Sequence, residues 1–332
     1  MLEGHGDDAW KYNSPIKADF SSNVLHGPLD DRLLAHLRDV LPNVTHYPEA
    51  GARRLQKAAA KAYGVDEGRL LATNGVTEAI YLIAQAFRER EAVIYTPAFA
   101  EYADACAVQG MKISYRDWAD LRTGKLPKNG LVFLCNPNNP TGWTVALKTF
   151  GEYPDALFVV DESYIEFAPG ASSALNQNQG NVLVLRSLTK SCRIPGLRVG
   201  FVIGPEPLVT SLRDGKMPWS VNRLAIEAGL YIFDHPQDFK VPVERLRAET
   251  VAWQEELRAT TGWKVWDTDT HYFLIGTPEP MKMKLLQEYG LLVRDASNFQ
   301  NLGPNIIRVA CGSPEHNRLL TEALGECARA GR

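Results

Sequence analysis

The segment VLVLRSLTKSCRIPGLRVGFVI, residues 182–203, contains two short apolar runs that are separated by a polar loop. The runs cover residues 182–186 and 199–203, and both have the length and the β-branched content that are typical of strands. Runs that are apolar almost throughout indicate strands that are buried on both faces. The segment therefore predicts two strands of a covered sheet, with Lys190 in the loop that joins them.

Five earlier runs extend the same pattern towards the N-terminus. They cover residues 69–72, 92–95, 112–115, 131–135 and 157–160. Between the first two, residues 77–88 place apolar side chains at helical spacing. Strands that alternate with helices are typical of a parallel sheet with helices on its faces. We therefore expect an α/β fold whose large domain contains a mostly parallel sheet of seven strands.

From residue 205 onward the pattern changes. Two helical stretches, residues 222–233 and 243–259, precede strand-like runs at 272–275, 291–294 and 306–309. A last helix is expected after Ser313, which can cap it, with Pro314 in its first turn. We expect an N-terminal arm (residues 1–35) that joins the small domain, a large domain (36–222) and a smaller α+β domain (223–332).

The charge and composition exclude several classes of protein. The 332 residues carry a net charge of -3, which gives no basic signature for nucleic-acid binding. Residues 1–8 are polar and acidic, and no apolar run approaches the roughly 20 residues that span a bilayer. The five cysteines include no C-x-x-C pair, so neither a zinc site nor a disulfide framework is expected. We expect a cytoplasmic protein with no metal and with no nucleic-acid or membrane partner.

Polar groups follow several of the predicted strands. They are the loop at 136–142, the segment 161–164, the segment 187–190, Arg198, and the turn at 74–77 that leads from a strand into a helix. Open α/β sheets bind ligands in the crevice beyond the carboxyl ends of their strands. These positions therefore predict one ligand site at the edge of the sheet.

The residue types in these groups match the needs of a pyridoxal phosphate site. Lys190 can bind the cofactor covalently if its pKa is lowered. Asp161 can keep the ring nitrogen protonated, so that the ring withdraws electrons from the substrate's α-carbon. Asn139 and Tyr164 can donate hydrogen bonds to the 3-oxygen of the ring. The phosphate needs helix N-terminal amides, hydroxyl groups and a cation. The candidates for these contacts are Gly75, Val76, Thr77, Ser187, Thr189 and Arg198.

Each feature has a plainer interpretation when it is taken alone. A lysine after a strand is usually a solvated surface residue. The pair Asp161-Glu162 could instead hold magnesium or cap the next helix, and the loop at 136–142 could be a turn only, since Pro, Asn and Gly are turn residues. Their ordered occurrence, each at a strand end or in a loop, favours a single functional site. The order along the chain is Asn139, Asp161, Lys190 and Arg198.

This ordered set resembles the fold-type-I pyridoxal-phosphate enzymes, in particular the branch that contains histidinol-phosphate aminotransferase and threonine-phosphate decarboxylase. The resemblance extends from His46-Tyr47-Pro48 to Arg308. It implies that Phe99 stacks on the cofactor ring and that Arg308 binds the substrate's α-carboxylate, a task that suits a guanidinium fork. It also implies that Tyr47 reaches the cofactor phosphate of a neighbouring subunit, and hence a homodimer. The plainer interpretation of Arg308 is an edge-strand charge.

Three segments, residues 99–102, 186–198 and 217–222, are more similar to the decarboxylases than to the aminotransferases. In the decarboxylases an N-terminal His-Gly begins an arm that approaches the substrate phosphate, which implies that His5 and Asn23 lie near the substrate. A disordered terminus is the alternative interpretation of His5. The sequence after Asn23 and the triplet Ser191-Cys192-Arg193 depart from the family pattern. These departures put the identity of the substrate in doubt and leave the cofactor assignment intact.

The resemblance therefore implies decarboxylation of L-threonine O-3-phosphate to (R)-1-aminopropan-2-yl phosphate, for cobalamin assembly. An aminotransferase of the histidinol-phosphate type is the alternative, because a small rotation of the bound substrate decides between the two reactions. A regulator with an aminotransferase-like domain is a third hypothesis, but no basic pair of helices precedes the predicted domains. The expected partners are a small phosphorylated amino acid and a second copy of the chain.

Overall fold

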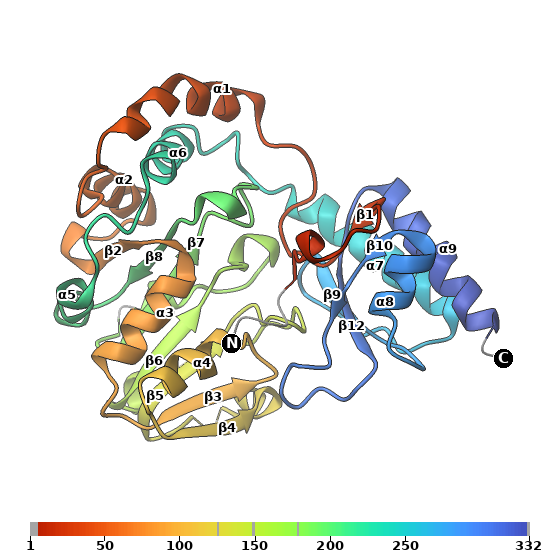
Figure 1. The fold of residues 1–332 in the computed structure, drawn as a ribbon. Helices are drawn as coiled ribbons and strands as arrows, with labels where there is room; N and C mark the ends of the chain where they lie inside the picture. The colour runs from red at the N-terminus through yellow and green to blue at the C-terminus, as the bar shows by residue number, and fades with distance from the viewer. Residues whose placement is uncertain (1–5, 125, 148–149, 178, 331–332) are drawn as a thin grey trace.

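A computed structural model describes residues 6–124, 126–147, 150–177 and 179–330 (Figure 1). The large domain is built on a sheet of seven strands. They are β2 (Leu70–Thr73), β3 (Ala92–Thr96), β4 (Ile113–Asp117), β5 (Asn129–Cys135), β6 (Asp155–Asp161), β7 (Val182–Ser187) and β8 (Gly200–Ile203). Their order across the sheet is β2-β8-β7-β6-β5-β3-β4. All seven overlap the strands expected from the sequence, and the α/β fold class is confirmed.

Within the described sheet, β8 alone runs antiparallel to its neighbours, β2 and β7. The remaining paired strands are parallel, so the sheet is mostly parallel as expected. A parallel connection needs a crossover of a dozen or more residues, usually with a helix. The link from β7 to β8 contains only the short 3₁₀ turn Pro195–Leu197, so the chain returns in the opposite direction. This tight return positions Lys190 and Arg198 at the end of the sheet where β7 finishes and β8 begins.

Both faces of the sheet are buried, because successive side chains of a strand enter different apolar clusters. On β6, Val159 lies in the cluster that includes α3 (Gly75–Ala86) and α4 (Glu101–Val108), whereas Phe158 lies in the cluster of the opposite face. Both side chains are fully buried. This double burial explains why the strands are apolar almost throughout.

Three helices cover the β2–β8 end of the sheet. They are α1 (Asp31–Val40), α2 (Arg53–Tyr63) and α6 (Arg223–Asp234), whereas α5 (Glu206–Gly215) packs on the other face, against β2 and α3. Leu33, Leu55 and Ile226 of these helices share one buried cluster. The sequence suggested a domain boundary after residue 222, which would separate α6 from α1 and α2. Because α6 packs on both, we propose that the large domain includes α6 and that the small domain begins with α7 (Val243–Thr261).

The small domain contains a three-stranded antiparallel sheet in the order β11-β12-β9. Its strands are β9 (Tyr272–Gly276), β11 (Arg294–Asp295) and β12 (Ile306–Ala310), with α7 and α9 (Pro314–Ala330) packed together beside them (Figure 1). A short helix, α8 (Lys282–Lys284), continues into the π turn Leu285–Tyr289. The helix α9 starts as expected, since the Ser313 hydroxyl accepts a hydrogen bond from the His316 amide at 3.1 Å.

The N-terminal arm is attached to the small domain through β1 (Ala18–Asp19), which pairs in parallel with β10 (Leu291–Leu292). The single strand expected at 291–294 was therefore wrong. It is divided into β10 and β11 because the two halves have different partners, β1 and β12. None of the described helices combines the length and the apolar composition that a membrane span requires.

Candidate active site

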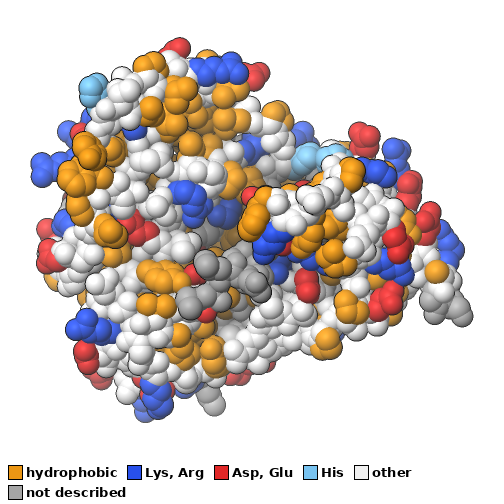
Figure 2. Space-filling model, viewed as in Figure 1, with side chains coloured by type: hydrophobic (Ala, Val, Ile, Leu, Met, Phe, Trp, Pro, Cys, Tyr) orange, Lys and Arg blue, Asp and Glu red, His pale blue; other side chains and the backbone are white. Residues whose placement is uncertain are grey.

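A cavity of about 260 Å³ lies where the strand ends of the large domain face the small domain and the N-terminal arm. Figure 2 shows a hollow between the two domains, with Lys and Arg side chains at it. Eleven of the residues singled out in the sequence line the cavity. They are Asn23, Val76, Thr77, Phe99, Asn139, Asp161, Tyr164, Thr189, Lys190, Arg198 and Arg308. The fold thus brings together side chains that are far apart in the chain, as the sequence predicts.

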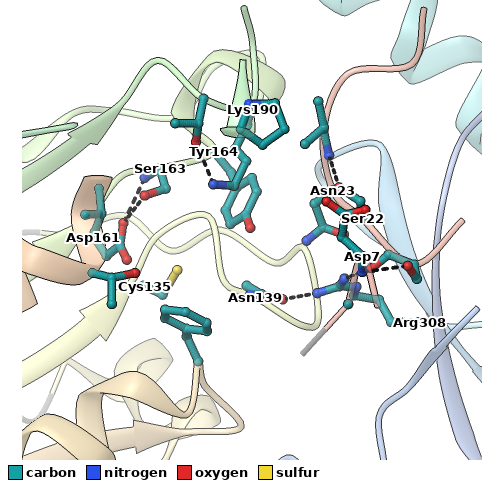
Figure 3. Close-up of a pocket in the computed structure, with 18 of the residues that line it drawn as sticks. Asp7, Ser22, Asn23, Cys135, Asn139, Asp161, Ser163, Tyr164, Lys190 and Arg308 are labelled. Atoms are coloured by element: carbon teal, nitrogen blue, oxygen red, sulfur yellow. Dashed lines mark hydrogen bonds between the residues drawn. The ribbon is translucent and has the colours of Figure 1, made fainter. Parts of the chain in front are cut away.

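Lys190 lies at the end of β7 with its amine directed into the cavity (Figure 3). Its Nζ atom donates a hydrogen bond to the Thr189 hydroxyl at 2.7 Å. Burial lowers the pKa of Lys190 to about 8; the positive charge of Arg198 contributes to this change and Asp161 opposes it. A substantial fraction of the amine is therefore neutral near physiological pH, as a nucleophile requires.

Asp161 ends β6 and is almost completely buried. Its Oδ1 atom accepts hydrogen bonds from the Ser163 amide at 3.0 Å and the Ser163 hydroxyl at 2.6 Å. Its Oδ2 atom accepts a hydrogen bond from the Tyr102 hydroxyl at 2.6 Å. Three donors therefore fix the carboxylate in one orientation at the cavity wall, and hydrogen bonds to a charged group are stronger than those to a neutral one.

At the N-terminus of α3, the backbone of Gly75 lies close to the side chain of Arg198. Gly75 has a φ of +75°, and a Cβ atom there would lie 2.5 Å from an Arg198 nitrogen, so the turn requires glycine. Burial lowers the pKa of Arg198, whose Nη1 atom donates to the Pro195 carbonyl at 2.9 Å. Ser187 lies behind the cavity wall, where its hydroxyl is 2.7 Å from that of Thr189. Amides at a helix N-terminus with an adjacent arginine form an anion-binding arrangement.

Arg308 approaches from the small domain, where it lies on β12. Its Nη1 atom donates to the Asn139 side-chain oxygen at 2.6 Å, and its Nη2 atom donates to the Ser21 carbonyl. Its Nε atom has no hydrogen-bond partner among the described residues. Burial lowers the pKa of Arg308 from its usual value. Arg308 therefore joins the large domain, the small domain and the arm at the cavity.

Tyr164 and Asn23 complete the wall between Lys190 and Arg308 (Figure 3). Burial raises the pKa of the Tyr164 hydroxyl, and Arg308 and Asn23 beside it act in the opposite direction. Asn23 is 3% exposed, and neither side-chain polar atom has a partner of hydrogen-bonding geometry among the described residues. A buried amide without partners is unusual in a folded protein and is expected where a ligand completes the site.

Of the other residues singled out in the sequence, Gly75 and Ser187 adjoin the lining residues Val76 and Thr189, and Tyr47 lies away from the cavity. Tyr47 is 80% exposed and packs against Trp219, with 5.2 Å between the ring centroids. Its contact with a neighbouring subunit stays a prediction. His5 lies outside the described residues.

The sequence did not point to several residues that the cavity contains. Tyr102 and Ser163 hold Asp161, and Gly6, Asp7 and Ser21 bring the arm to Arg308. A local signal existed for Ser163, because a serine two residues after an aspartate commonly bonds to it. Tyr102 follows Phe99 by about one helical turn, which places both on the same side of the chain. No local signal connects Ser21 with Arg308.

A second arginine, Arg294, lies next to Arg308 and was also missed. The two are directly opposite each other in the antiparallel pair of β11 and β12, so their side chains leave the same face of the sheet. Burial, and then Arg308, lower the pKa of Arg294 to about 10. Its guanidinium donates to the Asp295 carbonyl at 2.6 Å and to the Asn298 side chain at 2.8 Å. The carboxylates of Asp295 and Asp8 act in the opposite direction and offset part of the positive charge of Arg294.

The described part of the chain contains no cluster of three or more His, Cys, Asp or Glu residues that could hold a metal ion.

Comparison with known proteins gives four findings. A family model described as aminotransferase class I and II matches residues 15–324. Threonine-phosphate decarboxylase of Salmonella typhimurium is 32% identical over 92% of this chain and 90% of that protein. Histidinol-phosphate aminotransferase of Symbiobacterium thermophilum is 33% identical over 93% of this chain and 89% of that protein. The crystal structure of L-threonine-O-3-phosphate decarboxylase from Porphyromonas gingivalis matches with a TM-score of 0.89 and 33% identity, over 94% of this chain and 99% of that chain.

Proposed function

Because the chain belongs to the class I and II aminotransferase family, a family of pyridoxal-phosphate-dependent enzymes, we propose that it binds pyridoxal 5'-phosphate in this cavity and decarboxylates L-threonine O-3-phosphate. The product is (R)-1-aminopropan-2-yl phosphate, which would serve cobalamin assembly. The observation that carries the proposal is the lowered pKa of Lys190 in a cavity that also contains Asp161 and Arg308.

The residues of the cavity fit this cofactor in kind. The proposed contacts are Gly75, Val76, Thr77, Ser187, Thr189 and Arg198 for the phosphate, Asp161 for the ring nitrogen, Asn139 and Tyr164 for the 3-oxygen, and Phe99 for the ring face. Two observations support the fit independently of the family. The left-handed turn at Gly75 brings the N-terminus of α3 against the Arg198 guanidinium, and a Cβ atom there would collide with that side chain. The buried Nε atom of Arg308 has no partner among the described residues, and the amide of Asn23 forms no hydrogen bond of good geometry although Tyr164 lies beside it, as expected of groups that a ligand satisfies.

When bound, pyridoxal phosphate withdraws electrons from the substrate's α-carbon and weakens the bonds there. Lys190 supplies the amine that holds the cofactor and, when neutral, moves a proton to or from the α-carbon. Arg308, which is itself fixed by Asn139 and Ser21, binds the α-carboxylate and sets the rotation of the substrate. That rotation decides which bond breaks, and a misplacement of about 1 Å can cost on the order of 100-fold in rate.

The lowered pKa of Lys190 predicts a pH dependence for cofactor attachment. Only the neutral amine reacts, and because burial lowers the pKa to about 8, the neutral form dominates at a lower pH than for an ordinary lysine. We expect the rate of attachment to the cofactor-free protein to rise about tenfold between pH 7 and pH 9 and then to level off. Stopped-flow absorbance at a series of pH values measures this rate. A midpoint near the ordinary value of 10.5 contradicts the proposed environment of Lys190.

The paired arginines support a substrate with a second anionic group. Arg308 alone would suffice for an α-carboxylate, because one guanidinium binds a carboxylate in a bidentate manner. Arg294 adds a second buried cation on the same face and has no ion-pair partner among the described residues. Asp295 and Asp8 offset the charge of Arg294 only in part, so a further anion near the two cations would be favourable. A phosphate on the substrate meets this requirement.

A transamination of histidinol phosphate is the second candidate function. The observation in its favour is the 33% identity to the Symbiobacterium thermophilum aminotransferase, which is about the same as the identity to the decarboxylases. It would use the same cofactor and the same Lys190. A keto acid is the co-substrate that distinguishes it, because decarboxylation needs none.

We also propose that the chain forms a homodimer through the surface that carries Tyr47, Met217 and Trp219. Tyr47 is 80% exposed and Met217 is 74% exposed, and the Tyr47 ring packs at a tilt against Trp219, which is 48% exposed. Large exposed apolar side chains that gather at one place mark association surfaces. In such a dimer Tyr47 would contact the cofactor phosphate in the other subunit.

The test of the proposed function is a product analysis. The cofactor-loaded protein is incubated with L-threonine O-3-phosphate without a keto acid, and carbon dioxide and the amine product are measured. We expect steady release of both. Conversion of histidinol phosphate only when 2-oxoglutarate is present, with no carbon dioxide from L-threonine O-3-phosphate, would replace the decarboxylase with the aminotransferase.

A further inference from the structure

The start of the described chain lies at the cavity, although it belongs to the arm. Gly6 and Asp7 line the cavity next to Ser22 and Arg308 (Figure 3). Residues Ala9–Lys11 then form a single 3₁₀ turn on the small domain side, ahead of β1. The segment of residues 6–12, called the strap below, therefore forms part of the cavity wall.

The strap contacts Ser21, which holds Arg308, the residue that we propose to bind the substrate's carboxylate. The Asp7 amide donates to the Ser21 hydroxyl at 2.8 Å, and the Ser21 carbonyl accepts from Arg308. Gly6 lies so close to this carbonyl that a Cβ atom would be 2.2 Å from the Ser21 oxygen and 3.4 Å from Arg308. The docked position of the strap thus depends on glycine at residue 6. The strap is connected to Arg308 through one intervening residue, Ser21.

One buried ion pair ties the strap to the small domain. Asp8 is 6% exposed, and its two carboxylate oxygens accept hydrogen bonds from the Lys282 amine at 2.7 and 3.0 Å. The Tyr12 hydroxyl donates to the same carboxylate at 3.3 Å, and the Lys282 amine lies 5.4 Å from the centre of the Tyr12 ring. The side chains of Lys282 and Asp8 are only 14% and 9% exposed. Removing one member of a buried pair leaves an uncompensated charge, so such a pair is costly to break singly.

We propose that the Asp8–Lys282 ion pair is a latch that holds the strap over the substrate end of the cavity and thereby sets the affinity for the substrate. Asp8 and Lys282 are positioning residues, because they act through Gly6, Asp7 and Ser21. The role in substrate affinity rests on the proposed function, whereas the latch itself is a property of the chain without ligands. The fraction of molecules with a docked strap limits the apparent affinity, since only they present a complete site.

The neighbouring packing indicates that loss of the latch would free the strap without unfolding the small domain. Helix α8 is anchored by Met281 and Leu285, which are 1% and 0% exposed, independently of the strap. The arm remains attached through the pairing of β1 with β10. The only regular structure in the strap is the short turn Ala9–Lys11, and no residue of this turn is buried.

The test compares Asp8→Asn and Lys282→Met with a matched control, Lys284→Met. Lys284 lies on the same short helix and pairs with Glu279 at 2.8 Å, but this pair has no contact with the strap. Hydrogen exchange on the purified protein reports the strap directly, because the amides of Asp7, Lys11 and Tyr12 are hydrogen-bonded only when it is folded. We expect their exchange to accelerate about tenfold or more in the two latch variants and to stay unchanged in the control.

Kinetics of the cofactor-loaded variants test the link to the substrate. We expect KM for L-threonine O-3-phosphate to rise about tenfold in both latch variants, with kcat and the cofactor dissociation constant changed less than about twofold. Lys282→Arg, which keeps the cation, should restore most of the affinity. Gly6→Ala should raise KM in the same way, since its Cβ collides with Ser21 only in the docked strap.

The two parts of the inference fail separately. Unchanged exchange in Asp8→Asn and Lys282→Met, or the same change in Lys284→Met, overturns the latch. Faster exchange with an unchanged KM overturns its role in substrate affinity. If wild-type protein does not turn over L-threonine O-3-phosphate, the proposed function fails, and the exchange experiment still decides whether the latch exists.

Discussion

Replacement of Lys190 by alanine is expected to reduce turnover by about five orders of magnitude, the effect of removing a group on which every covalent step depends. The amine of Lys190 is the proposed attachment point of the cofactor and the proposed proton carrier at the α-carbon. No other lysine lines the cavity within the described residues, so none stands ready to replace it. Steady-state release of carbon dioxide measures the loss.

The Tm of the Lys190→Ala variant shows whether the loss of turnover comes from loss of the reacting amine or from unfolding. The positive charges of Arg198 and Arg308 both disfavour the protonated lysine. Its removal should therefore leave Tm unchanged or slightly higher. Lys112→Ala is the matched control, since Lys112 is exposed and pairs with Glu91 away from the cavity. Activity of the Lys190 variant within about tenfold of the wild type would remove Lys190 from the mechanism.

Replacement of Arg308 by lysine is expected to lower kcat/KM for L-threonine O-3-phosphate by about 100- to 1,000-fold, because a point charge does not reproduce a bidentate guanidinium contact. Arg308 also holds Asn139 and Ser21 together, and an amine cannot donate to both with the same geometry. The loss should therefore appear in kcat as well as in KM.

Inhibition by the amine product tests the role of Arg308, because this product lacks the α-carboxylate. Its inhibition constant should change by less than about threefold in Arg308→Lys if the arginine binds that carboxylate. Arg318→Lys, on the exposed face of α9, is the matched control. An equal loss of affinity for the substrate and for the amine product would assign Arg308 to another part of the ligand.

The sheet could be predicted because its strands are buried on both faces, which leaves a simple apolar signature in β5, β6 and β7. The direction of β8 could not be predicted in the same way, since an apolar run reads alike in both directions. The split between β10 and β11 depends on pairing with β1, more than 270 positions earlier in the chain, and no local pattern reports such a contact. The position of α6 likewise depends on α1 and α2.

The side of the cavity that we assign to the cofactor could be predicted better than the side that we assign to the substrate. Asp161, Lys190 and Arg198 each follow a strand or a tight return, so the order of the strands already brings them together. The substrate side is built from long-range contacts between the arm and the small domain, such as Ser21 with Arg308 and Asp8 with Lys282. These pairs are separated by 287 and 274 residues, so no local pattern in the sequence reports them.

The most direct test of the account is to identify the residue that holds the cofactor. The protein is loaded with pyridoxal 5'-phosphate, reduced with borohydride to make the attachment permanent, digested, and analysed by peptide mass spectrometry. The account predicts one modified peptide, with the cofactor on Lys190. Modification of a different lysine, or no modification of a protein that is folded and saturated with cofactor, would contradict it.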